Sequence, residues 1–248
     1  MTKTLKIIVL LVSIICLESC SKKKKEEINS AEMSYTKAME MLKKKNYNEA
    51  AEEFSKIDDE YPFSKWASKA QTMAVYAYYK EEEYAKLIGI VDDFTRLNPA
   101  NENVPYMTYM KGLSFYNQIP QIDRAQDDTQ QSSYSFRELI ARFPETEYAI
   151  DARKKLEFID EHLAGTKMSI GRYQINNKNF VGAIENFTEV INRYRLTSQT
   201  PEAYFRLIEI YYKIGVKEES NKIFQHLKSI YPQNTWTKMA QKIDPNFI

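Results

Sequence analysis

The apolar positions of this chain recur in a fixed frame that predicts a series of short amphipathic helices. Each copy has a small or apolar residue, a large apolar residue four positions later, another apolar residue three positions after that, and then a proline. Residues at i, i+4 and i+7 lie on one face of an α-helix, and the proline ends the helix and starts a turn. The four complete copies are Ala50-Phe54-Ile57-Pro62, Leu87-Val91-Phe94-Pro99, Ser132-Phe136-Leu139-Pro144 and Ser220-Phe224-Leu227-Pro232.

A fifth copy and a set of partner helices complete the pattern. Ala183, Phe187, Val190 and Tyr194 follow the same frame, but Arg195 stands where proline is expected. Helical periodicity also predicts helices over residues 31–44, 66–80, 104–118 and 201–214, one before each complete copy. In the third repeat a polar insertion, residues 119–130, separates this helix from its copy. Thr200 before Pro201 predicts a capped helix start. Residues 147–176 predict one long helix.

The frame resembles the second helix of a tetratricopeptide repeat, whose spacing is Ala-x3-Phe-x2-Ala-x4-Pro. Pro62 to Pro99 spans 37 residues, as does Arg195 to Pro232. The sequence therefore predicts an all-α fold, a right-handed superhelical tetratricopeptide-like solenoid of about five helical hairpins. Each hairpin of such an array buries its apolar face against its neighbours.

The first residues predict export. Residues 1–6 are basic, residues 7–17 are almost wholly apolar, and Ser19 precedes Cys20, which is typical of a signal peptide over residues 1–19. The apolar run is shorter than the roughly 20 residues of a membrane span. A cysteine after a small residue resembles the lipobox of bacterial lipoproteins, where it is acylated, although Glu18 departs from that pattern. The alternative is an ordinary cleaved signal with a chance cysteine.

Residues 20–30 are then expected to be a lipid-anchored flexible linker. Its basic run, Lys22 to Lys25, is interpreted as part of a solvated tether or as a contact with anionic lipid headgroups, and the two interpretations are compatible.

Composition argues against nucleic-acid binding and against catalysis. Removing residues 1–19 takes two of 35 bases and one of 34 acids, which leaves 33 of each and no global field. The two cysteines, Cys16 and Cys20, both lie at the signal, so no disulfide framework or thiolate metal site is expected. His162 and His226 are 64 residues apart, and no catalytic or nucleotide-binding motif occurs. We expect no enzyme activity, cofactor or metal.

Several motifs resemble one family in particular. They include Tyr61-Pro62-Phe63-Ser64-Lys65-Trp66-Ala67, Ala77-Tyr78-Tyr79-Lys80, Arg142-Phe143-Pro144, Asp151-Ala152-Arg153, Ile170-Gly171-Arg172-Tyr173 and Thr197-Ser198. These motifs, the insertion and the long helix occur in the order found in the BamD family of outer-membrane assembly lipoproteins, and are most similar to its alphaproteobacterial members. The resemblance runs from Cys20 to about residue 235.

The resemblance implies a non-enzymatic, lipid-anchored subunit of the β-barrel assembly machinery on the periplasmic face of the outer membrane. Its expected partners are the periplasmic domains of a BamA-like barrel subunit, other Bam lipoproteins, and unfolded outer-membrane proteins. The N-terminal repeats, residues 31–126, would receive the C-terminal targeting strand of client proteins. The C-terminal repeats, residues 127–240, would dock the partner subunit, and residues 241–248 form a tail.

Two sets of side chains are candidates for these contacts. Tetratricopeptide arrays line their groove with the first helix of each repeat, and tyrosine offers a large rigid surface with one polar tip. That frame predicts a client-peptide groove of Tyr35, Met39, Tyr76, Tyr79, Tyr106, Tyr109 and Tyr116. Arginine favours interfaces because its fork pairs carboxylates, and the candidates for the partner interface are Arg172, Arg193, Arg195 and Arg206. The alternatives are that the tyrosines only pack between hairpins and that the arginines are solvated.

Two other classes of function compete with this hypothesis. One is a different periplasmic tetratricopeptide adaptor that coordinates envelope constriction or peptidoglycan synthesis. Members of that class usually begin with a coiled coil, and residues 26–45 show no sustained heptads. The other is a lipoprotein enzyme, which would need a polar catalytic cluster that the sequence does not contain.

Overall fold

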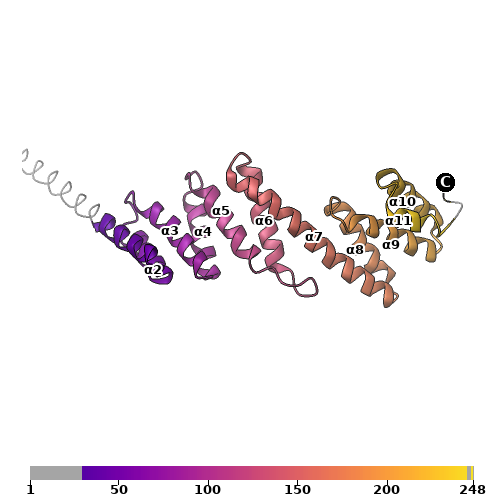
Figure 1. Ribbon diagram of the computed structural model, residues 1–248, viewed down its shortest axis with the longest axis horizontal. Helices are drawn as coiled ribbons and strands as arrows, with labels where there is room; N and C mark the ends of the chain where they lie inside the picture. Colours follow the sequence, from indigo (N-terminus) through magenta and orange to yellow (C-terminus); the bar gives the residue numbers. More distant parts are fainter. Residues whose placement is uncertain (1–29, 245–246, 248) are drawn as a thin grey trace, which may run out of the picture. The chain divides into compact units, whose positions relative to one another are not determined.

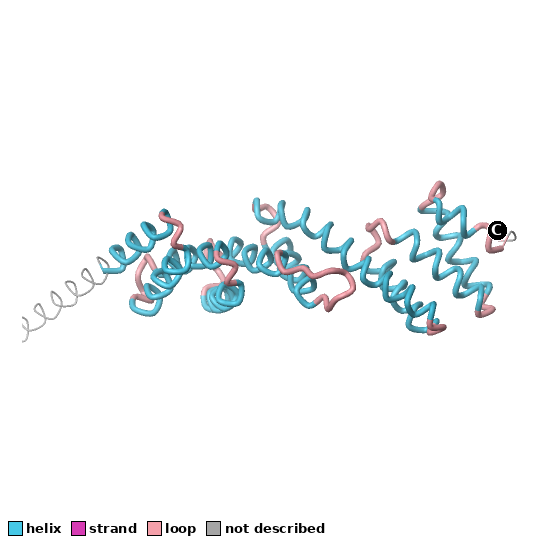
Figure 2. Tube along the Cα trace, turned by 60° about the horizontal axis from the view of Figure 1, so that its bottom comes forward, coloured by secondary structure: helices cyan, strands magenta, loops and turns pink. Residues whose placement is uncertain are grey.

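The regular structure of this chain is entirely helical over the part that the computed structural model describes, residues 30–244 and 247 (Figure 2). A helix described over residues 30–43 comes first. The helices that follow are α2 (Tyr47–Glu60), α3 (Ala67–Lys80), α4 (Tyr84–Leu97), α5 (Val104–Tyr116), α6 (Asp127–Arg142), α7 (Glu147–Asn176), α8 (Phe180–Arg193), α9 (Thr200–Lys213), α10 (Lys217–Ile230) and α11 (Thr235–Ala240). The predicted all-α fold is confirmed, and the five helices that were predicted with explicit residue ranges agree with these bounds to within two residues.

The chain divides into two compact units between Ser114 and Phe115. We call them the N-terminal unit and the C-terminal unit. This division lies inside α5, whereas the predicted division of the repeats by role follows residue 126. In the N-terminal unit α3 packs against both α2 and α4. In the C-terminal unit each helix from α6 to α10 packs against the next, and α11 lies against α9 and α10 (Figure 1). The predicted helical hairpins are therefore present.

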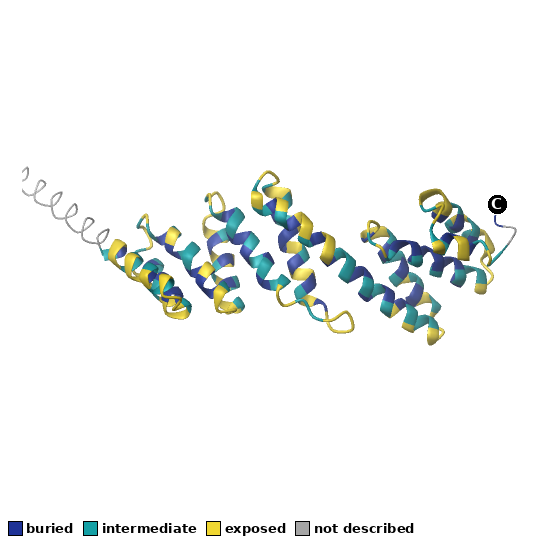
Figure 3. Cartoon of the chain, viewed as in Figure 1, coloured by how far each residue is buried: buried dark blue, intermediate teal, exposed yellow. Residues whose placement is uncertain are grey.

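The repeating apolar frame forms the core. All fifteen of its small and apolar positions, from Ala50 to Leu227, are at most 1% exposed. Figure 3 shows such buried residues along the faces that neighbouring helices share. Small residues such as Ala50, Ala183 and Ser220 let the helices approach closely, and the large side chain four positions later fills the space beside them.

The aromatic residue at the end of most copies stands at the helix C-cap. Tyr61, Phe143 and Tyr231 are the C-caps of α2, α6 and α10, and each donates its backbone N–H to the carbonyl four residues earlier. The following proline keeps the cap residue out of the helical conformation, so the helix stops there. Tyr194 takes the same place after α8 although Arg195 follows it. The aromatic cap therefore does not depend on the proline.

The polar insertion is shorter than predicted, because α6 begins at Asp127 rather than after residue 130. Asp127 and Asp128 occupy the first turn of α6, where acidic side chains stabilise the positive end of the helix dipole. The amide of Gln126 donates to the carbonyls of Gln121 and Arg124, which folds the preceding loop back on itself.

The last hairpin is covered by residues from the predicted tail. Phe247 is 7% exposed and stacks on Phe224 of α10, with ring centroids 5.0 Å apart. It also meets Tyr212 of α9 edge to face. Because the end of a helical array leaves an apolar face without a neighbouring hairpin, α11 and Phe247 supply the missing cover.

Some predictions concern residues outside the described part of the chain. The signal peptide of residues 1–19, the lipidation site Cys20 and nearly all of the linker over residues 20–30 lie there. Within the described residues, none of the helices combines the length and the apolar character needed to cross a bilayer.

Candidate binding surfaces

Tyr35 lies among aromatic side chains that join three helices of the N-terminal unit. Its ring centroid is 5.3 Å from that of Phe54 on α2 and 4.8 Å from that of Trp66, which precedes α3. The ammonium groups of Lys65 and Lys69 lie over the same indole, 5.3 and 5.4 Å from its centroid. Burial raises the pKa of Tyr35. We call these five side chains the Trp66 cluster; Tyr35 packs between hairpins in it, as the alternative hypothesis for the tyrosines holds.

The other predicted groove residues of the N-terminal unit differ in exposure. Tyr76 on α3 is 37% exposed and is the most accessible of the tyrosines predicted there. Tyr79 is half-buried, 6.1 Å from the ring of Tyr84 on α4. Tyr106 and Tyr109 of α5 and Met39 are half-buried as well. Tyr76 therefore has the most surface available for a ligand.

Tyr116 belongs to the C-terminal unit, where it packs among neighbouring helices. Its ring contacts Phe136 of α6 at 6.3 Å and Phe158 of α7 at 5.7 Å, and the ammonium of Lys155 lies over its face. These contacts occupy much of the ring, so Tyr116 packs against α6 and α7 within this unit.

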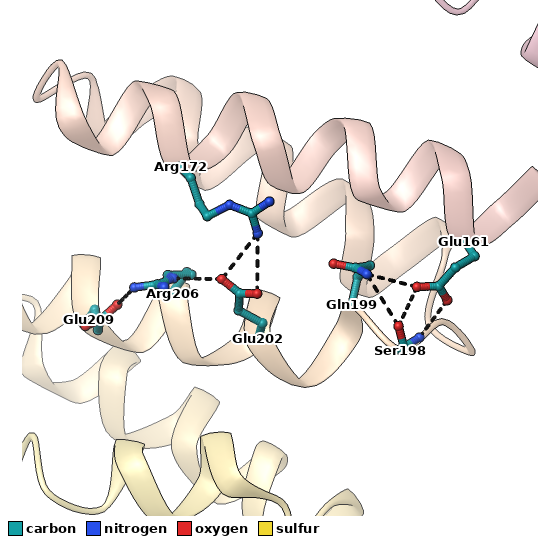
Figure 4. A network of polar contacts seen from close by, with 7 residues as sticks. All are labelled: Glu161, Arg172, Ser198, Gln199, Glu202, Arg206 and Glu209. Atoms are coloured by element: carbon teal, nitrogen blue, oxygen red, sulfur yellow. Dashed lines mark hydrogen bonds and ion pairs between the residues drawn. The ribbon is translucent and has the colours of Figure 1, made fainter. Parts of the chain in front are cut away.

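Arg172 and Arg206, two of the predicted partner-facing arginines, meet at Glu202 (Figure 4). Arg172 on α7 donates from Nη1 to both carboxylate oxygens of Glu202, at 3.3 Å each. On α9, Arg206 donates from Nε to Glu202 at 3.1 Å and from Nη1 to Glu209 at 2.8 Å. The guanidinium of Arg206 also lies over the ring of Trp236. Both arginines therefore hold helices of the C-terminal unit together.

A second polar contact ties α7 to the loop before α9. The carboxylate of Glu161 accepts the backbone N–H of Ser198 at 2.8 Å, the Ser198 hydroxyl, and the Gln199 amide at 2.9 Å (Figure 4). Burial alone would raise the pKa of Glu161, but these hydrogen bonds outweigh it and hold the pKa below its usual value. The only trace of this contact in the sequence is Ser198, which belongs to a family motif.

Arg193 and Arg195 lie at the exposed end of α8. Arg193 pairs with Glu189 at 3.0 Å, while its side chain stays 69% exposed. Arg195 is exposed, and its carbonyl accepts the Tyr231 hydroxyl at 3.4 Å. No described residue is a hydrogen-bond or ion-pair partner of the Arg195 guanidinium. These two arginines are more accessible to a partner than Arg172 and Arg206.

Comparisons with known proteins identify the family. A family model described as YfiO, outer membrane lipoprotein, matches residues 27–227. The outer membrane protein assembly factor BamD of Rickettsia prowazekii is 35% identical over 96% of this chain and 96% of its own length. That of Caulobacter vibrioides is 36% identical over 88% of this chain and 71% of its own. The chain belongs to the BamD family. As the motifs indicated, both relatives are alphaproteobacterial.

Membership of the BamD family bears on both competing classes of function. BamD proteins are outer membrane protein assembly factors and not enzymes, so the chain is an outer membrane lipoprotein of that kind rather than a lipoprotein enzyme. The match also favours this assignment over an adaptor for envelope constriction. Among the described residues no group of three or more histidines, cysteines or acids could hold a metal ion.

Among solved structures, the TPR2AB-domain:pHSP90-complex of yeast Sti1 aligns with 86% of this chain and 84% of its own, at 13% identity and a TM-score of 0.43. A likeness at that level adds nothing to the fold described above.

Proposed function

We propose that this chain is a lipid-anchored scaffold subunit of the β-barrel assembly complex, held at the periplasmic face of the outer membrane through Cys20. In this role it binds the periplasmic domains of a BamA-like barrel subunit, associates with other Bam lipoproteins, and receives the targeting strands of unfolded outer-membrane proteins. Family membership supports the assembly role, and the surfaces of the two units support a division of the binding work.

The client strand is assigned to the N-terminal repeats, residues 31–126. Tyr76 carries this assignment, because it is 37% exposed on the first helix of its hairpin, where repeat proteins of this type bind peptides. An exposed phenol ring can stack on an aromatic residue of a client strand and still hydrogen bond through its hydroxyl. Tyr35 supports Tyr76 indirectly, because it fixes the helix over residues 30–43 against Trp66 beside α3.

The barrel subunit is assigned to the C-terminal repeats, residues 127–240. Arg193 and Arg195 are the residues that we expect it to contact, because both are exposed at the end of α8. Arg172 and Arg206 contribute indirectly, by shaping the surface, because the guanidinium groups of both are already paired with the Glu202 carboxylate. An exposed arginine, such as Arg193 or Arg195, can pair with an acidic group of a partner through two hydrogen bonds.

Photo-crosslinking tests the client assignment. A labelled C-terminal strand of an outer-membrane protein is crosslinked to the full chain, and then to chains carrying Tyr76→Ser or Tyr109→Ser. We expect both substitutions to reduce crosslinking, with the larger loss at Tyr76. Tyr173→Ser is the matched control, because Tyr173 is a 69% exposed tyrosine of the C-terminal unit. Crosslinking that is unchanged in both variants would remove these tyrosines from the client site.

A further inference from the structure

A large cleft lies within the C-terminal unit, between α6, α7 and α8. Its volume is about 1160 Å³, and residues of these helices and of the loop before α6 line it. Pockets for small molecules commonly measure about 300–1,000 Å³, so this cleft is larger than most of them. All of its lining residues belong to one unit, and the client and partner sites assigned above use only Arg193 of them.

The cleft has more positive than negative charge. Four basic side chains line it, from Arg124, Arg137, Lys167 and Arg193, and Glu189 is the one lining carboxylate. The nearby acids Asp123, Asp127 and Asp128 are not among the lining residues.

Most of these cations already have an acidic partner, but the acidic groups do not neutralise all of the positive charge. Arg137 donates to both oxygens of Asp160, at 2.6 and 2.8 Å, and is neutralised by it. Glu189 alone serves two cations, Lys167 at 2.7 Å and Arg193 at 3.0 Å.

The side chain of Arg124 has no partner among the described residues. Its guanidinium makes no hydrogen bond or ion pair with any described residue, and only its backbone is used within the loop. Together with the shared Glu189, this leaves two positive charges in the cleft without an acid of their own.

Apolar surface is exposed between these charges. Tyr134 of α6 is 66% exposed and Ile170 of α7 is 41% exposed, and both line the cleft, together with the buried side chains of Leu163 and Tyr194. Exposed apolar surface enclosed by charged groups is typical of a site that another molecule covers.

We propose that this cleft docks an extended polypeptide segment of a partner, in which two carboxylates flank an aromatic or aliphatic side chain. One carboxylate pairs with Arg124 and the other with the Lys167–Arg193 pair, while the apolar side chain covers Tyr134 and Ile170. Such a segment can enter a space between helices, whereas the flat surface of a bilayer cannot follow the cations into it. The proposal rests on the partner-docking role proposed above and names the kind of segment that the C-terminal repeats bind.

The test uses the full chain purified in detergent and two fluorescein-labelled synthetic peptides. One peptide alternates Asp or Glu with Phe, and the other has Asn and Gln in place of every acid. Fluorescence anisotropy should show that the acidic peptide binds and that the amide peptide binds at least about fivefold more weakly. Equal binding of the two peptides would overturn the proposal.

Variants locate the binding. Arg124→Gln and Tyr134→Ser should each weaken binding of the acidic peptide by about fivefold, as expected for a partly exposed charged or aromatic contact. Neither substitution removes a contact that the fold uses. Arg142→Gln is the control, because it replaces an exposed arginine of α6 that lies outside the cleft lining, and it should bind as the unaltered chain does. If Arg124→Gln and Tyr134→Ser bind like this control, the cleft is not the site.

Vesicles containing phosphatidylglycerol provide the remaining comparison. If the cleft cations serve a membrane surface, Arg124→Gln will reduce vesicle binding and leave peptide binding intact, and this result contradicts the proposal. Peptide binding is measured on the isolated chain, so its failure would leave the association with a barrel subunit standing. Conversely, failure to recover a barrel subunit with the chain would leave a positive peptide result standing.

Discussion

Gly171 of α7 lies against the ring of Phe187 on α8 so closely that a Cβ atom on the glycine would be 2.6 Å from two ring carbons. Phe187 is a fully buried residue of the repeating frame and cannot swing away. The glycine therefore sets how closely α7 and α8 pack, which explains in physical terms why Gly171 stands in the motif Ile170-Gly171-Arg172-Tyr173.

Gly171→Ala should destabilise the C-terminal unit. Alanine favours a helix over glycine by up to about 1 kcal/mol, but overpacking a fixed aromatic ring costs about 1–3 kcal/mol, so we expect a net loss of about 1–2 kcal/mol in chemical denaturation. Gly165→Ala on the same helix is the control, because nothing lies within 4 Å of its Cβ position. It should stabilise the unit by about 0.5–1 kcal/mol. A Gly171→Ala chain as stable as Gly165→Ala would show that this contact does not limit the packing.

Glu161→Gln should weaken the link between α7 and the loop before α9. An amide cannot accept all three hydrogen bonds that the carboxylate accepts from Ser198 and Gln199, so we expect a loss of about 1 kcal/mol at neutral pH. Glu185→Gln is the control, because no described residue is a partner of that exposed carboxylate. It should change stability very little.

The same contact predicts a pH dependence. The folded-state pKa of Glu161 lies below its usual value of 4.5. Its contribution to stability is therefore fully present above pH 4.5 and is lost as the pH falls through the folded-state pKa. The difference in unfolding free energy between the unaltered chain and Glu161→Gln should shrink over that range. A difference that stays constant between neutral and acidic pH would contradict this role of the carboxylate.

Phe247→Ala should loosen the last hairpin. The ring is buried against Phe224 and Tyr212, and we expect a loss of about 2 kcal/mol, below the 3–5 kcal/mol of a phenylalanine enclosed on all sides. Faster amide hydrogen exchange in α10 and α11 would report it. Met239→Ala replaces a 41% exposed side chain of α11 and serves as the control. Unchanged exchange in Phe247→Ala would show that the tail does not cover the core.

Tyr35→Ala should destabilise the N-terminal unit much more than Tyr76→Ala. Tyr35 loses ring contacts with Phe54 and Trp66, each worth about 0.5–1.5 kcal/mol beyond the buried area. Tyr76 is 37% exposed, so its removal should cost less stability and act mainly on client binding. Thermal unfolding of the two variants measures the difference, and equal melting temperatures would contradict the division of roles.

The repeating frame could be predicted because its apolar residues are spaced so that they lie on the buried face of each helix. Ala183, Phe187 and Val190 must share one helix face whatever surrounds them, and all three are fully buried. Helix ends could be predicted equally well where an aromatic residue precedes proline.

The start of α9 could be predicted only in part. Pro201 lies in its first turn, but the Thr200 hydroxyl donates to the carbonyl of Tyr194 instead of capping the helix.

The polar contacts could not be predicted in the same way. Glu161 and Ser198 are 37 residues apart, and Arg172 and Glu202 are 30 apart. Which turns of two helices face each other depends on their packing angle and offset, which no local pattern specifies. For this reason the sequence could name Arg172 and Arg206 as candidates for a partner interface without revealing that both bind Glu202.

Co-purification tests the central claim most directly. The full chain, carrying an affinity tag, is recovered from outer membranes solubilised in mild detergent, and the proteins that accompany it are identified by mass spectrometry. The account predicts that a BamA-like barrel subunit is recovered with the chain, and that charge reversal at both Arg193 and Arg195 reduces the amount recovered. Recovery of the chain without any barrel-assembly subunit would contradict it.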